Sequence, residues 1–406
     1  MKLYLADMLA AQERRKHISF HTPGHKKRGA DITELSYSDN LSAPTGVIGQ
    51  AQADIAHILG ADASFLLTDG STSGVYAMLM ALRDAGVRKL AVPVCSHVSV
   101  LRGSSLMGLE LIPVAQEFSG GIARQPTVEA VRHAMETADA LILTSPDYYG
   151  FFPDLGAIAE LMQAQNKPLV IDGAHGSHLH GTALHASNYA SMWVDGVHKS
   201  LPAMTQGAVV SAKGIWTDLL AESVPCFRTT SPSYPILASI EYAVKYPRNE
   251  RIERAAEGVK RALGALENPD WSKIVIPFGK KSGDARRFLE SRGVYPEFDD
   301  GNYLMFYLSP ATRRRELKKL VHLVKRLPRG EVASDARMRG RTGKTTVALL
   351  PQEAVGRVCA QTCGLFPPCM PVLLPGDVVS GDAARRLSGA VSAFGLSDGK
   401  IIVFED

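Results

Sequence analysis

The chain has 406 residues, of which 45% are hydrophobic and 21% charged, and its formal net charge is +4. This length allows two domains, or one large and one smaller, and the composition is that of a globular protein with a full core. The small charge and the lack of aromatic residues among the basic clusters argue against a nucleic-acid partner. No apolar run reaches the roughly 18–20 residues of a membrane span.

Residues 1–20 lack the long apolar core and small-residue cleavage site of a signal peptide, so we expect a short amphipathic helix there. The chain has five cysteines, an odd number that favours free thiols in a reducing cytoplasm over a disulfide framework. They are Cys95, Cys226, Cys359, Cys363 and Cys369. We therefore expect a cytoplasmic protein.

Short apolar runs alternate with helical patterns between residues 54 and 210, which is typical of βαβ units around a mostly parallel sheet. The expected strands are 64–67, 89–93, 141–144 and 169–171, with a helix over 75–83. These elements predict an α/β large domain over residues 50–245, preceded by an N-terminal segment over residues 1–49.

The order of elements changes after the large domain. The expected elements are a helix over 250–266, a strand over 273–276, a helix over 283–291, a strand over 303–308 and a helix over 313–327. This order predicts a smaller α+β domain over residues 246–406. The proline-rich stretches 366–371 and 374–376 are expected to form a shaped loop, because proline interrupts regular helix.

The stretch from Lys167 to Gly207 carries the two residues that most restrict the function. The apolar run 169–171 ends at Asp172, and a second apolar approach, 192–194, leads to Lys199. Open α/β sheets bind their ligands at the carboxyl ends of the strands. An acid and a lysine at neighbouring strand ends are what pyridoxal phosphate needs, since the lysine forms a Schiff base and the acid keeps the pyridine nitrogen protonated.

A candidate phosphate site lies in the turn from Asp69 to Gly74, which joins a strand to the start of a helix. Free backbone N–H groups and the helix dipole favour an anion at such a position, and the hydroxyls of Ser71 and Thr72 add donors. The same residues also suit an ordinary helix N-cap. Together with the acid and the lysine, the turn predicts a phosphate-binding site.

Other chemistry-bearing residues are less specific. His97 follows a strand end, where its ring could stack on a cofactor or serve as an ordinary polar loop residue. The histidines between residues 175 and 185 are dense enough to suggest a metal, but they lack a helical spacing, and we expect no metal site. A P-loop at 340–346 is disfavoured because Met338 stands where its first glycine should be.

Seven segments, in the same order along nearly the whole chain, resemble the fold-type-I pyridoxal-phosphate family of ornithine/lysine/arginine decarboxylases. They are FHTPGHKKRG (20–29), the region 43–79, SPDYYGFFPDL (145–155), DGAHGSHL (172–179), HKSLPAMTQG (198–207), TTSPSY (229–234) and FPPCMPVLLPGD (366–377). The resemblance implies a large domain like that of aspartate aminotransferase, with a mostly parallel sheet, and a smaller α+β C-terminal domain. It implies the compact form, without an N-terminal wing domain.

The resemblance also implies roles for individual residues. Lys199 would form the Schiff base with pyridoxal 5'-phosphate, Asp172 would pair with the pyridine nitrogen, and His97 would stack on the ring. Further cofactor contacts would come from Gly70, Ser71, Thr72, His175 and His198. The active site in this family lies at a dimer interface, so Ser231 and Ser233 would reach the cofactor of the partner.

Three departures from the family pattern stand close to the expected site. Val98 occupies the position after the stacking histidine, where lysine is common. Gly196 stands three residues before the Schiff-base lysine, where a serine commonly supplies a phosphate hydroxyl. Cys369 and Met370 replace a glycine and an isoleucine in the C-terminal loop. These changes leave cofactor binding expected and the substrate open.

The expected reaction is α-decarboxylation of a basic L-amino acid (lysine, arginine or ornithine) to the amine and CO₂, as in polyamine biosynthesis, by a homodimer or a higher homo-oligomer. Glu297 is the expected contact for the distal cation of the substrate, with Asp299 and Asp300 as alternatives. Two other functions remain open. They are transamination or oxidation of an amino acid on the same fold, which would give a keto acid, and non-catalytic binding of the cofactor or an amino acid.

Overall fold

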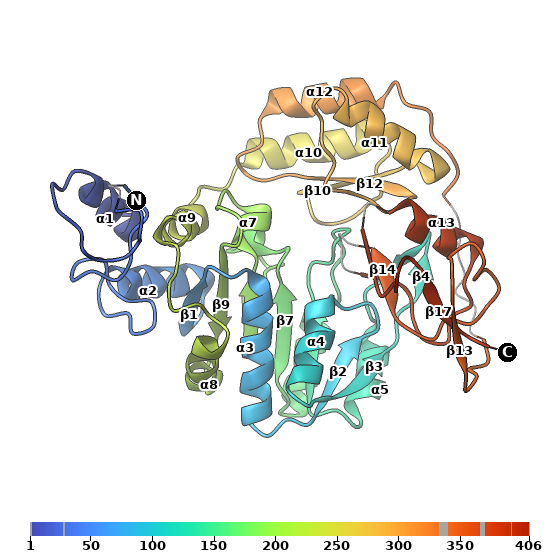
Figure 1. The fold of residues 1–406 in the computed structure, drawn as a ribbon, viewed down its shortest axis with the longest axis horizontal. Helices are drawn as coiled ribbons and strands as arrows, with labels where there is room; N and C mark the ends of the chain where they lie inside the picture. Colours follow the sequence, from blue (N-terminus) through green and yellow to red (C-terminus); the bar gives the residue numbers. More distant parts are fainter. Residues whose placement is uncertain (1, 27–28, 333–339, 366–369, 391, 406) are drawn as a thin grey trace.

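The computed structural model describes residues 2–26, 29–332, 340–365, 370–390 and 392–405. At its centre is a seven-stranded sheet with helices on both faces, and the later part of the chain adds smaller sheets beside it (Figure 1). Across the sheet the strands are β1 (Ala63–Leu67), β9 (Ala208–Ala212), β8 (Met192–Asp195), β7 (Leu169–Gly173), β6 (Ala140–Thr144), β2 (Lys89–Pro93) and β3 (Glu110–Val114). Strand β9 runs opposite to the other six strands of this sheet, which all point the same way. This mostly parallel sheet confirms the expected α/β class.

The central strands are apolar throughout because both faces of the sheet are buried. In β7, Leu169 and Ile171 belong to the core on one face, and Val170 belongs to the core on the other. The first core is covered by α1 (Tyr4–Glu13), α2 (Val47–Leu59), α5 (Val128–Met135), α6 (Leu155–Ala164) and α9 (Tyr234–Val244). The second core is covered by α3 (Ser71–Asp84), α4 (Val98–Leu106) and α8 (Trp216–Ser223).

The N-terminal helix α1 is tied to α9 by one buried carboxylate. Glu241 is fully buried, and its two oxygens accept hydrogen bonds from the backbone N–H groups of Tyr4 and Leu5, each at 2.8 Å. The first N–H groups of a helix have no partner within the helix, so this carboxylate satisfies two of them. Lys245 balances its charge, with Nζ 3.0 Å from Oε1.

A second layer of strands and helices follows the large sheet along the chain. It contains β10 (Lys273–Pro277), β12 (Tyr303–Tyr307) and β11 (Phe298–Asp299), paired antiparallel, and the helices α10 (Glu250–Leu263), α11 (Ser282–Glu290) and α12 (Arg314–Val324). Apolar residues of these helices and strands form a separate core. The strand–helix–strand order expected from the sequence is confirmed, and the helices end a few residues earlier than predicted.

The last part of the chain has its own small core, built around α13 (Gly381–Gly389). Its strands are β13 (Thr346–Leu349), β14 (Cys363–Leu365), β15 (Met370–Leu373), β16 (Ala393–Phe394) and β17 (Ile401–Phe404), and a short hairpin of β4 (Phe118–Ser119) and β5 (Ile122–Ala123) lies nearby in Figure 1. The expectation of a loop over residues 370–371 is wrong, because these residues start β15. Strand β15 lies at the edge of its sheet, where the missing N–H of Pro371 is tolerated. Residues 366–369, which include Cys369, lie outside the described residues.

Apolar contacts also join the two layers. Tyr148 and Tyr149, which follow β6, pack with Val275 of β10 and Phe298 of β11 in a shared cluster. The division at residues 49 and 245 stays a prediction, and the structure shows two separate cores after residue 246. Among the described residues, no helix is both long and apolar enough to cross a bilayer.

Candidate active site

A pocket lies at the carboxyl edge of the parallel strands, where ligand sites of open α/β sheets are found. Its lining includes polar side chains from five separate places in the chain: the start of α3, the loop before α4, the loop after β6, the end and loop of β7, and α7 (Val197–Ser200). The ionisable and hydroxyl residues among them are Ser71, Cys95, Ser96, His97, Ser99, Thr144, Asp147, Tyr148, Asp172, His175 and Lys199.

Asp172 and Lys199 reach this pocket from neighbouring parallel strands. Asp172 pairs in register with Val194, so the loops after β7 and β8 leave the sheet side by side. Asp172 is buried, and its Oδ1 accepts a hydrogen bond from the Ala174 N–H at 3.2 Å. The acid and the lysine expected at adjacent strand ends therefore do line one pocket.

Lys199 lies against His175. Lys199 stands in the single helical turn α7, and its Nζ is 3.1 Å from Nε2 of His175. Burial first, and then the charges of Lys199 and Lys273, lower the pKa of His175 well below its usual value. The His175 ring is therefore neutral near pH 7, and its Nε2 can accept a hydrogen bond from Lys199.

The loops after β7 and β8 touch at Gly196. A Cβ atom added at Gly196 would lie 2.4 Å from the carbonyl oxygen of Ala174, closer than any side chain permits. The serine common at this position in the resembling family has no room in this conformation. The departure noted in the sequence is therefore matched by a close backbone approach between the segments that carry the acid and the lysine.

His97 caps the helix that begins beside the pocket. Its Nδ1 accepts from the Ser99 N–H at 3.1 Å, so the proton of the neutral ring lies on Nε2. Burial lowers the pKa of His97, the charges of Lys199 and Arg102 lower it further, and Asp172 opposes them. A neutral, half-buried imidazole on the pocket wall suits the stacking role expected for it.

The start of α3 supplies the expected anion site. Gly70 precedes the helix with a positive φ of 80°, and Ser71, the first residue of α3, lines the pocket. Gly74 lets the helix lie close to the sheet, since a Cβ there would come within 2.7 Å of Val194. The N-terminus of a 14-residue helix is thereby held at the pocket, where its N–H groups favour a phosphate.

These groups fit pyridoxal phosphate by their chemistry. An amine, a carboxylate, a neutral imidazole and a helix N-terminus with a hydroxyl converge on one pocket. Within the described residues, Nδ1 of His175 is buried without a hydrogen-bond partner. A buried polar nitrogen is costly unless a ligand or water satisfies it, so a polar ligand atom beside His175 is consistent with the site.

Some expected residues do not line the pocket in the single chain. Among the described lining residues, Gly70, Thr72, His198, Ser231, Ser233 and Glu297 are missing. Nδ1 of His198 lies 3.0 Å from the Gly207 carbonyl. Ser231 is exposed, and Ser233 stands at the N-cap position of α9 without a capping hydrogen bond from its side chain. Their contact with the cofactor of a partner stays a prediction.

Glu297 is linked to the pocket through a tyrosine. The Tyr148 hydroxyl donates a hydrogen bond to Glu297 Oε1 at 2.7 Å, and the Tyr148 ring packs edge-on against His175 with centroids 4.5 Å apart. Glu297 itself is exposed. It therefore lies at the rim of the site, one side chain away from His175.

One pocket residue, Asp147, was not predicted from the sequence. It lines the pocket, is buried, and accepts hydrogen bonds from the backbone N–H groups of Tyr149 and Phe151, each at 2.9 Å. Burial raises its pKa to about 6, against the effect of these hydrogen bonds. The signal in the sequence was its place three residues after the end of the strand 141–144, close to a strand end like the one that identified Asp172.

Comparison with known proteins places these residues in a wider group. A family model described as "Orn/Lys/Arg decarboxylase, major domain" matches residues 28–270. The uncharacterized protein YaaO of Bacillus subtilis is 26% identical over 457 residues, covering 97% of this chain and 95% of that protein. The arginine decarboxylase of Bacillus subtilis is 26% identical over 443 residues, covering 90% and 89% of the two chains.

Solved structures share the fold. The lysine decarboxylase of Francisella novicida superposes with a TM-score of 0.74 at 15% identity, over 99% of this chain and 80% of that one. The constitutive lysine decarboxylase of Escherichia coli gives a TM-score of 0.72 at 16% identity, over 100% and 82%. Likeness at this identity confirms the fold-type-I architecture expected from the sequence.

Proposed function

The chain belongs to the Orn/Lys/Arg decarboxylase family, and from this premise we propose that it decarboxylates a basic L-amino acid with pyridoxal phosphate as cofactor. It is a decarboxylase by its relatives, several of which are named arginine decarboxylase and one constitutive lysine decarboxylase. The single observation that carries the proposal is the convergence of Lys199, Asp172 and His97 on one pocket.

Each of these residues has a distinct task. When bound, the cofactor supplies an electron sink for the carbanion left by loss of CO₂. Lys199 holds the cofactor covalently through Nζ, and Asp172 keeps a proton on the pyridine nitrogen. The ring of His97 covers one face of the pocket and excludes water from it, and Ser71 with the N–H groups of α3 binds the phosphate.

His175 and Lys199 form the proton-handling pair. Their nitrogens are 3.1 Å apart, so the neutral imidazole would accept a hydrogen bond from Lys199 Nζ when that nitrogen is not bound to the cofactor. A proton held between these two atoms lies at the strand-end edge of the pocket, where the substrate Cα is expected. This pair is the proposed source of the proton that Cα receives after CO₂ leaves.

The rim residue Glu297 is the proposed contact for the distal cation of the substrate. Its hydrogen bond from Tyr148 orients one carboxylate oxygen and leaves the other to bind an ammonium or a guanidinium. Ser231 and Ser233 are proposed to complete the site of a partner subunit in a homodimer.

The reaction can be tested directly. The purified protein, supplied with pyridoxal phosphate, is incubated with lysine, arginine and ornithine, and released CO₂ and amine are measured. The proposal predicts equal amounts of CO₂ and amine from one or more of these substrates. A keto acid in place of the amine would contradict decarboxylation and support transamination or oxidation, and no product from any of the three would contradict the proposed substrate class.

A further inference from the structure

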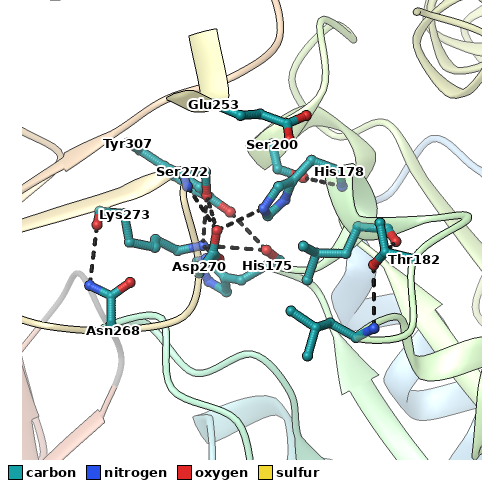
Figure 2. A network of polar contacts seen from close by, with 12 residues as sticks. His175, His178, Thr182, Ser200, Glu253, Asn268, Asp270, Ser272, Lys273 and Tyr307 are labelled. Carbon is teal, nitrogen blue, oxygen red and sulfur yellow. Dashed lines mark hydrogen bonds and ion pairs between the residues drawn. The ribbon is translucent and has the colours of Figure 1, made fainter. Parts of the chain in front are cut away.

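A wholly buried ion pair lies at the start of β10, beside the loop after β7 that carries His175 (Figure 2). The Lys273 Nζ is 2.8 Å from Asp270 Oδ2, and neither side chain is exposed. Such a pair is expensive to bury, because both charges lose their hydration. None of the roles proposed above for the pocket residues uses these two charges.

Asp270 is surrounded by donors. Its Oδ1 accepts hydrogen bonds from the Ser272 N–H at 2.9 Å and the Ser272 hydroxyl at 2.7 Å, and lies 2.8 Å from His178 Nε2. Burial raises the pKa of Asp270, but His178 and Lys273 outweigh it and hold this pKa well below the usual value. Asp270 is therefore a carboxylate that fixes Lys273 in place.

Lys273 faces acceptors on its other sides. Its Nζ lies 3.4 Å from the His175 carbonyl oxygen and 4.0 Å from the centre of the Tyr307 ring. An ammonium has three donors and no acceptor, so an environment of oxygens and an aromatic face suits the charged form. Burial lowers the pKa of Lys273, and Asp270 opposes that shift.

Tyr307 contacts the same residue from β12. Its hydroxyl donates to the His175 carbonyl at 3.1 Å, and its ring stacks on the His175 ring at 5.8 Å and 20°. The carbonyl of His175 thus accepts two hydrogen bonds from the second layer of the protein, while the ring of His175 meets Lys199 of the large sheet.

We propose that Lys273 and Asp270 are positioning residues: the buried pair and Tyr307 hold His175 against Lys199, and the Lys273 charge adds to the electrostatic environment of the His175 ring. This inference rests on the proposed role of Lys199 and His175 in the site. It assigns a function to the ion pair of Lys273 and Asp270, which the second layer places beside His175.

The groups that face His175 allow the sign of the effect to be worked out. Burial is the largest cause that opposes protonation of His175, followed by the charges of Lys199 from α7 and Lys273 from β10; His97, from the loop before α4, opposes it only when protonated, and Asp270 favours it. Burial raises the pKa of Tyr307 well above its usual value, so its hydroxyl is neutral near pH 7. Removing the Lys273 charge takes away a positive charge near His175 and leaves the negative charge of Asp270 without its partner. Each of these two effects raises the pKa of His175.

The test uses full-length protein with histidine labelled for NMR, and the His175 signal is assigned with a His175→Gln variant. Lys273→Met should raise the pKa of His175 by about half a unit or more, since a nearby charge is lost. It should also lower kcat by about tenfold with a smaller change in KM, because a misplaced catalytic pair slows the step it serves.

Lys260→Met is the matched control. Lys260 is also a buried lysine, and its Nζ contacts the same loop through the Asp270 carbonyl at 2.8 Å, but it makes no hydrogen bond to His175 among the described residues. It should cost stability without moving the His175 pKa. An equal shift in both variants, or no shift with Lys273→Met, would overturn the electrostatic part.

Tyr307→Phe tests the positioning part, and it serves alone if the lysine variant fails to fold. It removes one hydrogen bond to His175 and keeps every charge, so kcat should fall while the His175 pKa stays in place. An unchanged kcat would overturn the positioning role. Because the NMR titration needs no turnover, a shifted pKa in a protein that releases no CO₂ would refute the proposed reaction and leave the electrostatic part of this inference standing.

Discussion

Single residues determine how closely the loops of this site can approach each other, and Gly196 is the clearest example. The residue lets the loop after β8 touch the loop after β7, and a Cβ there would meet backbone at 2.4 Å. Backbone cannot turn aside as a flexible side chain can, so the loops must separate. That separation would move Lys199 away from Asp172.

We predict that Gly196→Ala loses about 1–3 kcal/mol of unfolding free energy, the usual cost of overpacking. It should also weaken binding of pyridoxal phosphate, as measured by absorbance titration. Gly258→Ala is the control, because Gly258 lies in α10 with open space around it. That change should be neutral or stabilise by up to about 1 kcal/mol. Equal effects of the two substitutions would refute the steric explanation.

Asp147 gives a prediction on pH. Burial raises its folded-state pKa to about 6 from 3.8, so folding favours the protonated carboxyl. The stabilising contribution is complete below about pH 4 and is lost as the pH rises through 6. Asp147→Asn does not titrate, so its stability relative to wild type should improve between pH 4 and pH 7 by roughly 2–3 kcal/mol.

Urea unfolding at a series of pH values measures this difference. A gap between Asp147→Asn and wild type that stays constant from pH 4 to pH 7 would show that Asp147 has an ordinary pKa. Part of the difference in unfolding free energy between Asp147→Asn and wild type does not depend on pH, because it reflects the two backbone hydrogen bonds that Asp147 accepts. The test compares only the part that changes with pH.

At the scale of elements, strand ends and helix starts decide where the chemistry lies. Apolar runs bounded by turns predicted β2 without error and β6, β7 and β10 to within two residues. The same pattern placed Asp172 at the end of one strand and Lys199 shortly after the end of another, and parallel strands present their carboxyl ends at one edge. The turn before α3 was predicted from its hydroxyls and glycines in the same way.

Contacts between distant elements could not be read from local patterns. The pairing of Asp270 with His178 joins residues 92 positions apart, and the hydrogen bond from Tyr148 to Glu297 spans 149. Neither is implied by spacing along the chain. The strand at Met370–Leu373 was missed because its proline argued against regular structure, whereas an edge strand accepts it.

The attachment of α1 gives a prediction at the scale of elements. Glu241→Gln removes one acceptor for the N–H groups of Tyr4 and Leu5 and leaves Lys245 with one partner fewer. We expect a loss of about 1–3 kcal/mol, the cost of unsatisfied buried groups. Limited proteolysis should then cleave within the first 20 residues sooner than in wild type. An unchanged cleavage rate would mean that apolar contacts alone hold the helix.

At the scale of the whole molecule, the pocket depends on two layers that fold around separate cores. The large sheet supplies Lys199, Asp172 and His97, and the second layer supplies Lys273 and Tyr307 from β10 and β12. The aromatic cluster around Tyr148 and Phe298 fixes one layer on the other. The large sheet therefore supplies the reactive groups of the site, and the position of the second layer determines how they are oriented.

A shared site in a homodimer predicts complementation between inactive variants. Lys199→Ala is mixed, under conditions that exchange subunits, with a variant in which Ser231 and Ser233 are both alanine. If these serines complete the partner's site, each hybrid dimer has one site free of both changes, and about a quarter of wild-type activity should return. Full loss in every mixture, despite exchange, would contradict the shared site.

The central claim is that Lys199 binds pyridoxal phosphate covalently in the pocket beside Asp172. Borohydride reduction of the cofactor-loaded protein, followed by mass spectrometry of its peptides, tests this most directly. We predict that the reduced cofactor is found on Lys199, and that Lys199→Ala carries none. Cofactor fixed on another lysine, or retained at wild-type level by Lys199→Ala, would contradict the account.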